Sequence, residues 1–405
     1  KVDGCSRIEP GGSVRRWADT CHDLDLVAST VDPDALTAAC CPAFDYDVIL
    51  FPRQSSEHIF ETMRYAQWEG KTCVFEIDDD LDHVPPASPA FATYHQGTEE
   101  SAMIRKFMHH CHGMTCTTKE IARWYYQCTQ NVSVVENFID FSLRDWNVDV
   151  AYSGGVPFIK PKPARRLPGL EDKIVIGWQG GSTHVEDLQL LGPSISGILK
   201  KRENVVFAYY GAYEQMIEWV QRYGIPSDRV FHISARPFWE HPTGLHGVDI
   251  GLAPIACNQF NLAKSHLKLL EGMAAGAAMI GSNVGPYARF ERRHPGSVLT
   301  VGTGKWSHNT WGEAILRLVD NPDLLQQMKV RGRQLTIDRY SLEKNIDLWP
   351  AAWQSIIQRV DEGLIGPPNR PPQGGYMMYG SAGANDKCPC GSGLKYKKCC
   401  KEAWG

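Results

Sequence analysis

Lys264, Lys268 and Glu271 share one face of a segment whose apolar residues recur at helical spacing from about 263 to 275. The first turn of a helix presents backbone N–H groups that attract anions, and a lysine adds a full positive charge. Lys264, Ser265 and Lys268 are therefore predicted to bind a diphosphate and to stabilise it as a leaving group. Glu271, one turn deeper, is placed to accept hydrogen bonds from ribose hydroxyls. Alternatively, the three charged residues form ion pairs on a solvated helix face.

Two glycines, Gly180 and Gly181, follow an apolar run that predicts a strand over 173–180. Glycine has no side chain, so the backbone beside it is open to the close approach of phosphate oxygens. We therefore add Gly180 and Gly181 to the candidate diphosphate site.

Three consecutive carboxylates, Asp78, Asp79 and Asp80, end the strand predicted over 71–80. Such a run is costly unless it is solvated, paired or bound to a cation. We expect one of the three aspartates to contact hydroxyl groups of a second substrate, the acceptor of a transferred group, and we include Asp79 among the candidate catalytic residues. Two alternatives are that they cap the following turn, or that Asp78 and Asp80 bind a metal.

The cysteines of CPCGSGLKYKKCC have a spacing that can surround one tetrahedral zinc ion. The predicted ligands are Cys388, Cys390, Cys399 and Cys400. Because so short a segment has no hydrophobic core, metal binding would supply most of its folding energy. The alternative is that the cysteines pair in disulfides. Lysines around the cysteines form a basic patch that could contact nucleic-acid phosphates or a protein, or could only keep the segment soluble. These lysines are Lys387, Lys395, Lys397, Lys398 and Lys401.

Short apolar runs alternate with helical patterns through the main body, which is typical of parallel sheets covered by helices. In the first half, strands are predicted over 46–53, 71–80, 113–118 and 132–138, with a helix over 56–70. In the second half, strands are predicted over 173–180, 205–211, 229–234, 248–255, 277–282 and 297–301. Helices there are predicted over 187–200, 213–223 and 263–275. The predicted fold class is α/β, with two Rossmann-like doubly wound domains and a cleft between them.

The predicted organisation places the domain that carries the three aspartates, the acceptor domain, first. The domain that carries the diphosphate site, the donor domain, comes second. The N-terminal Rossmann-like domain spans 1–160, a proline-rich hinge spans 161–172, and the C-terminal Rossmann-like domain spans 173–340. A helix over 341–365, kinked at Pro350, crosses back to the N-terminal domain. A flexible tether over 366–386 then leads to the small zinc knuckle over 387–405.

The overall composition limits the partners and the location of the protein. A net charge of -4 provides no global field for nucleic acid, so such a partner would need a local basic patch. No apolar run reaches the ~20 residues of a membrane span, and the first residues lack the pattern of a secretion signal. We therefore expect a cytoplasmic protein, in the host cytoplasm if it is viral, without integral membrane association and with reduced cysteines.

The segment from 173 to about 360 resembles the donor domain of retaining GT-B glycosyltransferases. Their signature is a glutamate ahead of a helix, seven residues, a second glutamate and AMAxGxPVIxS, and Glu271 followed by GMAAGAAMIGS matches its second half. Ala263 replaces the first glutamate, and WQGGSTH replaces the Arg and Lys that usually follow the first strand. We therefore expect Lys264 and Lys268 to take over the role of those cations. The C-terminal cysteines resemble the SEC-C motif.

The resemblance implies an enzyme that moves a sugar from a nucleotide-sugar donor, a UDP-sugar, to an acceptor hydroxyl with retention of configuration. The basic zinc knuckle favours a hydroxymethylated base of viral DNA as the acceptor. A polysaccharide, lipid-linked or protein acceptor is the alternative. Because Ala263 and the replaced cations depart from the signature, a non-catalytic, transferase-like binding scaffold is a further hypothesis.

Overall fold

The computed structural model describes residues 46–143, 172–181, 184–211, 214–234, 238–302 and 307–363. It also describes the segments 5–10, 26–30, 149–153, 156–160 and 169–170, and residues 146, 236, 385, 395 and 397. Nearly all of the predicted hinge, tether and zinc knuckle lies outside the described residues. The chain divides into two compact units: the first contains 1–84, 92–136 and 347–405, and the second contains 85–91 and 137–346.

The first unit is built on a parallel sheet with the strand order β3-β4-β5-β6. Its strands are β3 (Val48–Pro52), β4 (Thr72–Ile77), β5 (Gly113–Cys116) and β6 (Val132–Val134). Its helices are α2 (Glu57–Trp68), α3 (Phe91–Tyr94), α4 (Glu99–His110), α5 (Lys119–Trp124) and α15 (Leu348–Asp361). The segments β1 (Cys5–Pro10) and β2 (Leu26–Thr30) form a separate antiparallel pair.

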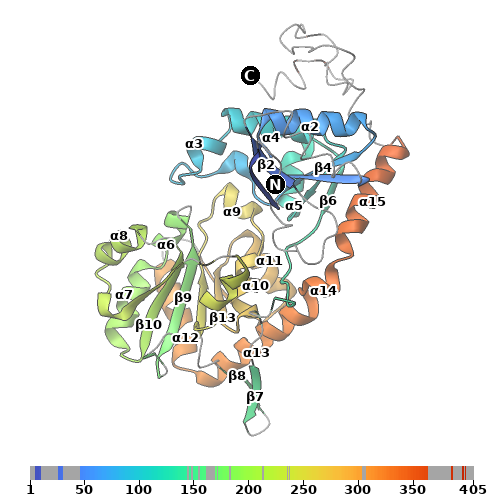
Figure 1. Cartoon of the computed structure of the whole chain (residues 1–405). Coiled ribbons are helices and arrows are strands. Elements are labelled where there is room, and N and C mark those ends of the chain that lie inside the picture. Colours follow the sequence, from blue (N-terminus) through green and yellow to red (C-terminus); the bar gives the residue numbers. More distant parts are fainter. Residues whose placement is uncertain are drawn as a thin grey trace. The chain divides into compact units, whose positions relative to one another are not determined.

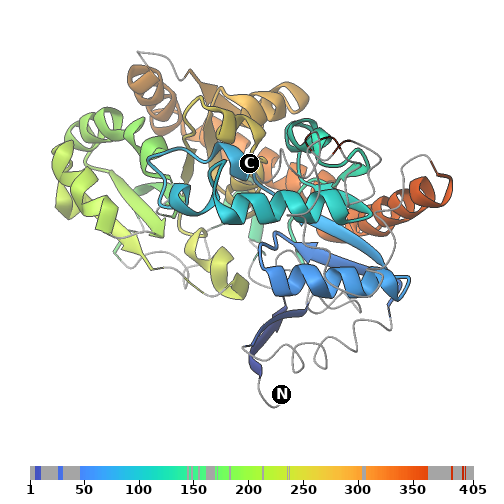
Figure 2. The same cartoon turned by 90° about the horizontal axis from the view of Figure 1, so that it is seen from above.

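Aromatic packing holds the helices α2 and α4 together and fixes α4 on the sheet. The ring of Phe107 in α4 lies edge to face against Phe60 of α2, with 5.3 Å between centroids, and 5.7 Å from Phe75 of β4. Figures 1 and 2 show the two helices side by side. All three rings are buried, so they form the core on this face of the sheet.

The segment predicted as one kinked helix over 341–365 forms two helices, α14 (Leu342–Asn345) and α15. Pro350 lies in the first turn of α15, where a missing backbone N–H breaks no helical hydrogen bond, so it does not kink the helix interior. Helix α15 packs on the sheet of the first unit. Asn131 Nδ2 donates to the carbonyl of Ile356 at 3.0 Å, and Arg359 Nη2 donates to Ser133 Oγ at 2.9 Å.

The second unit contains a six-stranded parallel sheet with the order β11-β10-β9-β12-β13-β14. Its strands are β9 (Ile174–Gly180), β10 (Val205–Gly211), β11 (Val230–Ile233), β12 (Ile250–Ala253), β13 (Ala278–Ser282) and β14 (Val298–Val301). Its longer helices are α7 (Gly192–Lys201), α8 (Glu214–Arg222), α10 (Leu267–Ala274), α11 (Gly285–Arg293), α12 (Ser307–Val319) and α13 (Pro322–Arg339). The short helices are α6 (Val185–Gln189) and α9 (Gln259–Ala263), and β7 (Asp149–Ser153) and β8 (Val156–Lys160) form a hairpin.

Two hydrophobic clusters cover the two faces of this sheet. Neighbouring strand residues point to opposite faces, so Val175 and Ile176 of β9 belong to different clusters. The first cluster includes Leu270 of α10 and Phe290 of α11, and the second includes Ile195 of α7. Figure 1 shows α7 and α8 on one side of the strands and α10 and α11 on the other. The predicted strands of both halves are present, and the α/β fold class is confirmed.

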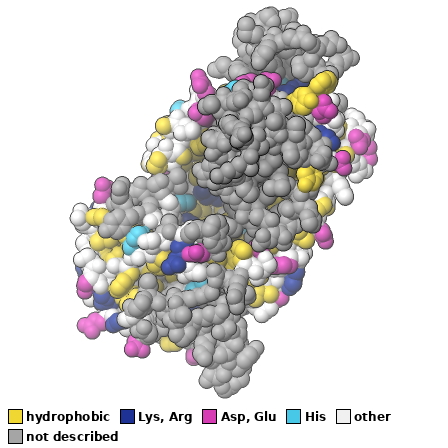
Figure 3. All heavy atoms as spheres, in the orientation of Figure 1, with side chains coloured by type: hydrophobic (Ala, Val, Ile, Leu, Met, Phe, Trp, Pro, Cys, Tyr) yellow, Lys and Arg dark blue, Asp and Glu magenta, His cyan; other side chains and the backbone are white. Residues whose placement is uncertain are grey.

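The described surface carries charges of both signs. On the face drawn in Figure 3, the acidic and basic side chains of the described residues are interspersed. Within the described part of the chain, no helix combines the length and hydropathy of a membrane span.

Candidate functional site

The order of the six strands marks one place in the second unit where a ligand site is expected. Strands β9 and β12 are neighbours, but the chain continues from them to opposite sides of the sheet, to β10 and to β13. The loops after two such strands diverge and leave an opening at the carboxyl ends. Gln179 lies at this end of β9, and the segment leading to α10 follows β12. The residues predicted to bind a diphosphate and a ribose lie on these segments.

Helix α10 begins at Leu267, which is later than the sequence predicts. Helix α9 has ended by Lys264, whose extended backbone, with φ -59° and ψ 157°, leaves the helical path. A turn over 264–266 therefore separates two short helices. The Ser265 hydroxyl stabilises this turn, because its Oγ accepts hydrogen bonds from Asn137 Nδ2 at 2.9 Å and from the backbone N–H of Leu267 at 3.4 Å.

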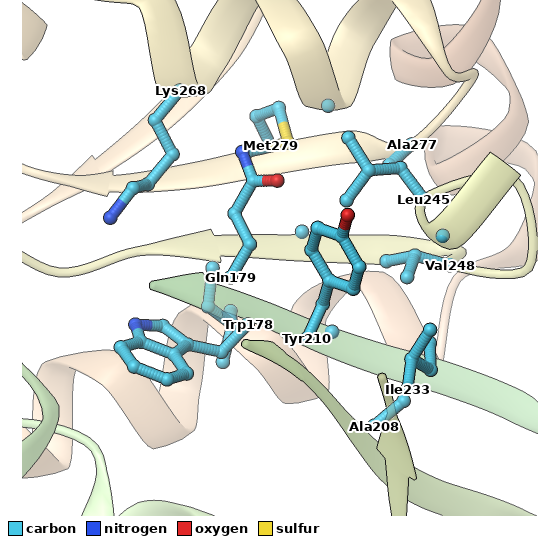
Figure 4. Close-up of a pocket in the computed structure, with 15 residues that line it drawn as sticks. Trp178, Gln179, Ala208, Tyr210, Ile233, Leu245, Val248, Lys268, Ala277 and Met279 are labelled. Atoms are coloured by element: carbon cyan, nitrogen blue, oxygen red, sulfur yellow. The ribbon is translucent and has the colours of Figure 1, made fainter. Parts of the chain in front are cut away.

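Lys268 has a buried amine for which the described residues offer no hydrogen-bond partner. Its Nζ lies 5.9 Å from the centre of the Trp178 ring, and Figure 4 shows the two side chains at the same end of a pocket. The pKa of Lys268 is lowered from 10.5 to about 8, first by burial and then by the charge of Lys264. The carboxylates of Asp187 and Glu271 act in the opposite direction. A buried cation without a hydrogen-bond partner is costly, so a bound anion would stabilise it.

Glu271 is held by side chains from other parts of the sheet. Gln179 Nε2 donates a hydrogen bond to Oε2 of Glu271 at 2.8 Å. His241 Nε2 lies 3.5 Å from Oε1, and His241 Nδ1 is hydrogen-bonded to the Tyr210 hydroxyl at 3.1 Å. A carboxylate offers about four acceptor positions, which is enough for these contacts and for the hydroxyls of a ribose. Its orientation is therefore set before a ligand arrives, which lowers the entropic cost of binding.

A mainly apolar pocket lies at this site, and Gln179 and Tyr210 point into it from β9 and β10 (Figure 4). Gln179 Oε1 is buried and receives no hydrogen bond from the described residues. Because the Gln179 amide nitrogen is bound to Glu271, the oxygen is the group left for a ligand donor. The apolar lining includes Ala208, Ile233, Leu245, Val248 and Met279.

His184 and Asp187 form a pair at the start of α6, directly after β9. The carboxylate Oδ2 of Asp187 accepts a hydrogen bond from His184 Nδ1 at 2.8 Å. Its Oδ1 accepts from the backbone N–H of Ala256 at 2.6 Å and from Asn261 Nδ2 at 3.0 Å. The pKa of His184 is lowered from 6.5 to about 4, first by the charge of Lys268 and then by burial. His184 therefore lies next to the predicted diphosphate residues.

The two glycines of the predicted diphosphate site, Gly180 and Gly181, have different surroundings. A Cβ atom at Gly180 would lie 2.4 Å from the Trp178 ring, so glycine is required there for the indole to pack. A Cβ atom at Gly181 would meet no atom of the described residues within 4 Å. The side of Gly181 on which a side chain would lie is thus open, and its role beside phosphates stays a prediction.

The three consecutive aspartates follow β4 in the first unit. Asp78 and Asp79 are half-buried, and Asp78 Oδ1 lies 3.8 Å from Arg53 Nη1. Asp80 is fully buried and its Oδ2 is hydrogen-bonded to His83 Nδ1 at 2.8 Å, whereas its Oδ1 has no hydrogen-bond partner among the described residues. Burial raises the pKa of Asp80 from 3.8 to about 6. Asp80 thus orients His83, and Asp78 and Asp79 are the more accessible carboxylates.

Sequence reasoning assigned no role to Gln179, His184, Asp187 and His241. Gln179 and Glu271 are 92 positions apart, so no local pattern connects them. For His184 and Asp187 the sequence does contain a local pattern. His184 and Asp187 are three positions apart at the start of a helical pattern, the spacing at which side chains on a helix meet.

The four predicted zinc ligands lie outside the described residues. They are Cys388, Cys390, Cys399 and Cys400. Among the residues that the structure describes, no three histidine, cysteine or acidic side chains are placed to hold a metal ion. The cysteines with described side chains are free thiols.

His266 gives the second unit a predictable dependence on pH. Its buried ring packs against Phe290 and Tyr340, and burial lowers its pKa from 6.5 to about 3. The folded protein holds this imidazole neutral, whereas the unfolded chain protonates it below about pH 6.5, so its contribution to stability is complete above that pH and is lost as the pH falls toward 3. We expect this one group to cost about 2 kcal/mol of unfolding free energy between pH 7 and pH 5.

The variant His266→Phe should make unfolding of the second unit less dependent on pH, because phenylalanine fills the same aromatic site without titrating. Denaturant titrations at pH 7, 6 and 5 measure this dependence. The matched control is His232→Gln, since His232 is exposed on β11. Equal pH dependence in His266→Phe and the wild type would show that His266 is not the group responsible.

Comparison with solved structures shows that the chain has the GT-B fold of glycosyltransferases. HepE from Anabaena, solved in complex with UDP, is 12% identical, and the match covers 82% of this chain and 82% of that chain with a TM-score of 0.55. Sucrose-phosphate synthase from Thermosynechococcus elongatus is 15% identical, with 82% and 77% covered and a TM-score of 0.54. TarM from S. aureus is 13% identical, with 80% and 59% covered and a TM-score of 0.55. At these identities the similarity establishes the fold.

The C-terminal resemblance noted in the sequence is also confirmed. The family model of the SEC-C motif matches residues 385–402, which include the four predicted zinc ligands. A comparison with curated protein sequences gives no match.

Proposed function

We propose that the chain is a retaining glycosyltransferase that moves a sugar from a nucleoside-diphosphate donor, a UDP-sugar, to a hydroxyl group. The observation that carries this proposal is the buried amine of Lys268, which has no hydrogen-bond partner among the described residues and lies one turn from the fixed carboxylate of Glu271. A diphosphate would satisfy the amine, and a ribose would satisfy the carboxylate. HepE, which shares the fold, has been solved with UDP and with UDP-glucose, and this supports a uridine donor.

Departure of the diphosphate is the step that these residues would assist. The bond between the anomeric carbon and the diphosphate oxygen breaks, and negative charge grows on the diphosphate. Lys268 and Lys264 would stabilise that charge, and a buried amine does so more strongly than a solvated one because water screens it less. Ser265 fixes the turn that presents the lysines, and the open backbone at Gly181 allows the phosphates to approach.

The acceptor is assigned to the first unit, at the carboxyl end of β4. Asp78 and Asp79 are accessible carboxylates that can accept hydrogen bonds from acceptor or sugar hydroxyls, and Asp79 is the one to which we assign a catalytic role. Asp80 would act through His83, whose ring it orients. As the acceptor we propose a hydroxymethylated base in DNA, supported by the lysines of the SEC-C segment. A polysaccharide, lipid-linked or protein acceptor is the alternative.

The donor proposal is tested by titrating the full chain with UDP, CDP, ADP and GDP and then by assaying sugar release from the matching nucleotide sugars. We expect UDP to bind most tightly, and NMR of the product to show the anomeric configuration of the donor. If no nucleotide binds, the proposal that the chain is a glycosyltransferase is contradicted, and a non-catalytic scaffold is favoured. A product of inverted configuration would contradict retention alone.

The C-terminal segment is predicted to hold one structural zinc ion through Cys388, Cys390, Cys399 and Cys400. Metal analysis should find zinc in the full chain and none after deletion of 387–405, because the ligands are removed. The same deletion should weaken retention on DNA and reduce the salt dependence of binding, while UDP binding stays unchanged. DNA retention that is the same in both forms would contradict a DNA-binding role for the segment.

A further inference from the structure

The hydrogen bond between His184 and Asp187 fixes which nitrogen of the imidazole carries the proton. The carboxylate Oδ2 of Asp187 can only accept, so the Nδ1 atom that lies 2.8 Å from it must be the protonated one. In the neutral ring the other nitrogen, Nε2, then carries a lone pair. The carboxylate is itself fixed by the backbone N–H of Ala256 and by Asn261 Nδ2, so this tautomer is built into the fold.

The charged groups that act on His184 come from three elements. Lys268 belongs to α10, Lys264 to the turn after α9, and Asp187 to α6 itself. The two lysines oppose a positive charge on the ring, and the single carboxylate favours one. Without a ligand the charge of Lys268, burial and the charge of Lys264 together prevail, and the pKa of His184 falls to about 4. A diphosphate bound to the lysines would reverse this balance, because it would bring additional negative charge to the same place.

We propose that His184 is a third diphosphate-binding residue, and that it takes up a proton from solvent when the donor binds. A phosphate oxygen offers only lone pairs, so it can contact Nε2 only if that nitrogen is protonated. With Asp187 accepting at Nδ1 and a phosphate accepting at Nε2, the ring must be an imidazolium ion. The proton comes from water, no bond of the donor changes on binding, and the ion then neutralises part of the charge that develops when the diphosphate leaves.

This inference rests on the proposed donor site and adds a property that the lysines alone do not give. His184 lies between β9 and α6, on the loop that faces the turn of Lys264. An imidazolium ion formed only in the complex would add positive charge there only while the donor is bound. The free site thus avoids a third positive charge beside Lys264 and Lys268.

Calorimetry with UDP-glucose at pH 6.5 tests the proposal, in buffers that differ in their heat of ionisation. UDP-glucose is chosen because its phosphates have no group that titrates near neutral pH. Lys268, with a pKa of about 8, is charged before and after binding at this pH, so it contributes little proton uptake. We expect the wild-type chain to take up about one proton for each UDP-glucose bound. The variant His184→Gln, which keeps an N–H donor but does not titrate, should bind about tenfold more weakly and take up none.

The control variant His232→Gln removes an exposed histidine of the same unit and should leave proton uptake and affinity unchanged. Binding by the wild type without proton uptake would overturn the proposal, and so would equal uptake in the wild type and in His184→Gln. Thermal melting of each variant excludes misfolding as the cause of a difference. If UDP and UDP-glucose give no heat of binding with any form, the donor site itself is wrong, and this inference is wrong with it.

Discussion

Replacement of Lys268 by methionine is expected to lower kcat/KM for sugar transfer by about 100-fold to 1,000-fold, the effect typical of removing one preorganised group that stabilises a developing anion. The amine is buried and has no hydrogen-bond partner among the described residues, so its removal breaks no described hydrogen bond. Methionine has a similar length and no charge. We therefore expect the Tm of the donor-free variant to be no lower than that of the wild type, because a costly buried charge has been removed.

The combination of lost activity and retained stability distinguishes a ligand-binding lysine from a structural one. Steady-state kinetics with a UDP-sugar gives the first quantity, and thermal melting gives the second. The control is Lys201→Met, since Lys201 is exposed at the end of α7 and should tolerate the change. A Lys268→Met variant that melts far below the wild type would indicate that the amine supports the fold. One with unchanged kcat/KM would remove Lys268 from the site.

The second large effect is expected for the replacement of Glu271 by alanine, which should weaken UDP binding by about 10-fold to 100-fold. The loss corresponds to the roughly 1.5–3 kcal/mol of hydrogen bonds made by a charged acceptor. The comparison of UDP with 2′,3′-dideoxy-UDP makes the test specific for the ribose. The wild type should prefer UDP, and Glu271→Ala should bind the two nucleotides equally, because the group that distinguishes them is missing.

Two variants control this experiment. Glu313→Ala changes an exposed carboxylate of α12 in the same unit and should bind like the wild type. Glu271→Gln keeps a side chain that Gln179 can bind but loses the charge, so an intermediate affinity is expected. If Glu271→Ala retained the wild-type preference for UDP over the dideoxy nucleotide, another group would have to bind the ribose.

The architecture was predictable because it depends on local patterns. The runs around Val175 and Val206 are short, apolar and bounded by polar or glycine residues, and both form central strands of the second sheet. The helix that carries Lys268 and Glu271 was likewise found from its apolar spacing. The predicted start of this helix is too early, because Lys264, Ser265 and His266 are all compatible with a helix and only tertiary contacts separate them from it. Those contacts are the hydrogen bond from Asn137 to Ser265 and the burial of His266 among aromatic rings.

The remainder of the site depends on residues that the fold brings together from distant positions. Gln179 and His241 both lie against Glu271, but Gln179 belongs to the end of β9 and His241 to the 3-10 helix Phe238–Gly244 that follows β11. A single sequence contains no pattern that links such residues. The His184 and Asp187 pair was visible in the sequence, but its position beside Lys268 was not, and that position gives the imidazole its role.

A crystal structure of the full chain with UDP tests the central claim most directly. That claim places the diphosphate at Lys264 and Lys268 and the ribose at Glu271. We predict density for the phosphates within hydrogen-bond distance of Lys268 Nζ and His184 Nε2, and ribose hydroxyls within the same distance of the Glu271 carboxylate. UDP bound elsewhere on the chain, or a complex in which Lys268 keeps its buried amine without a phosphate partner, would contradict the claim.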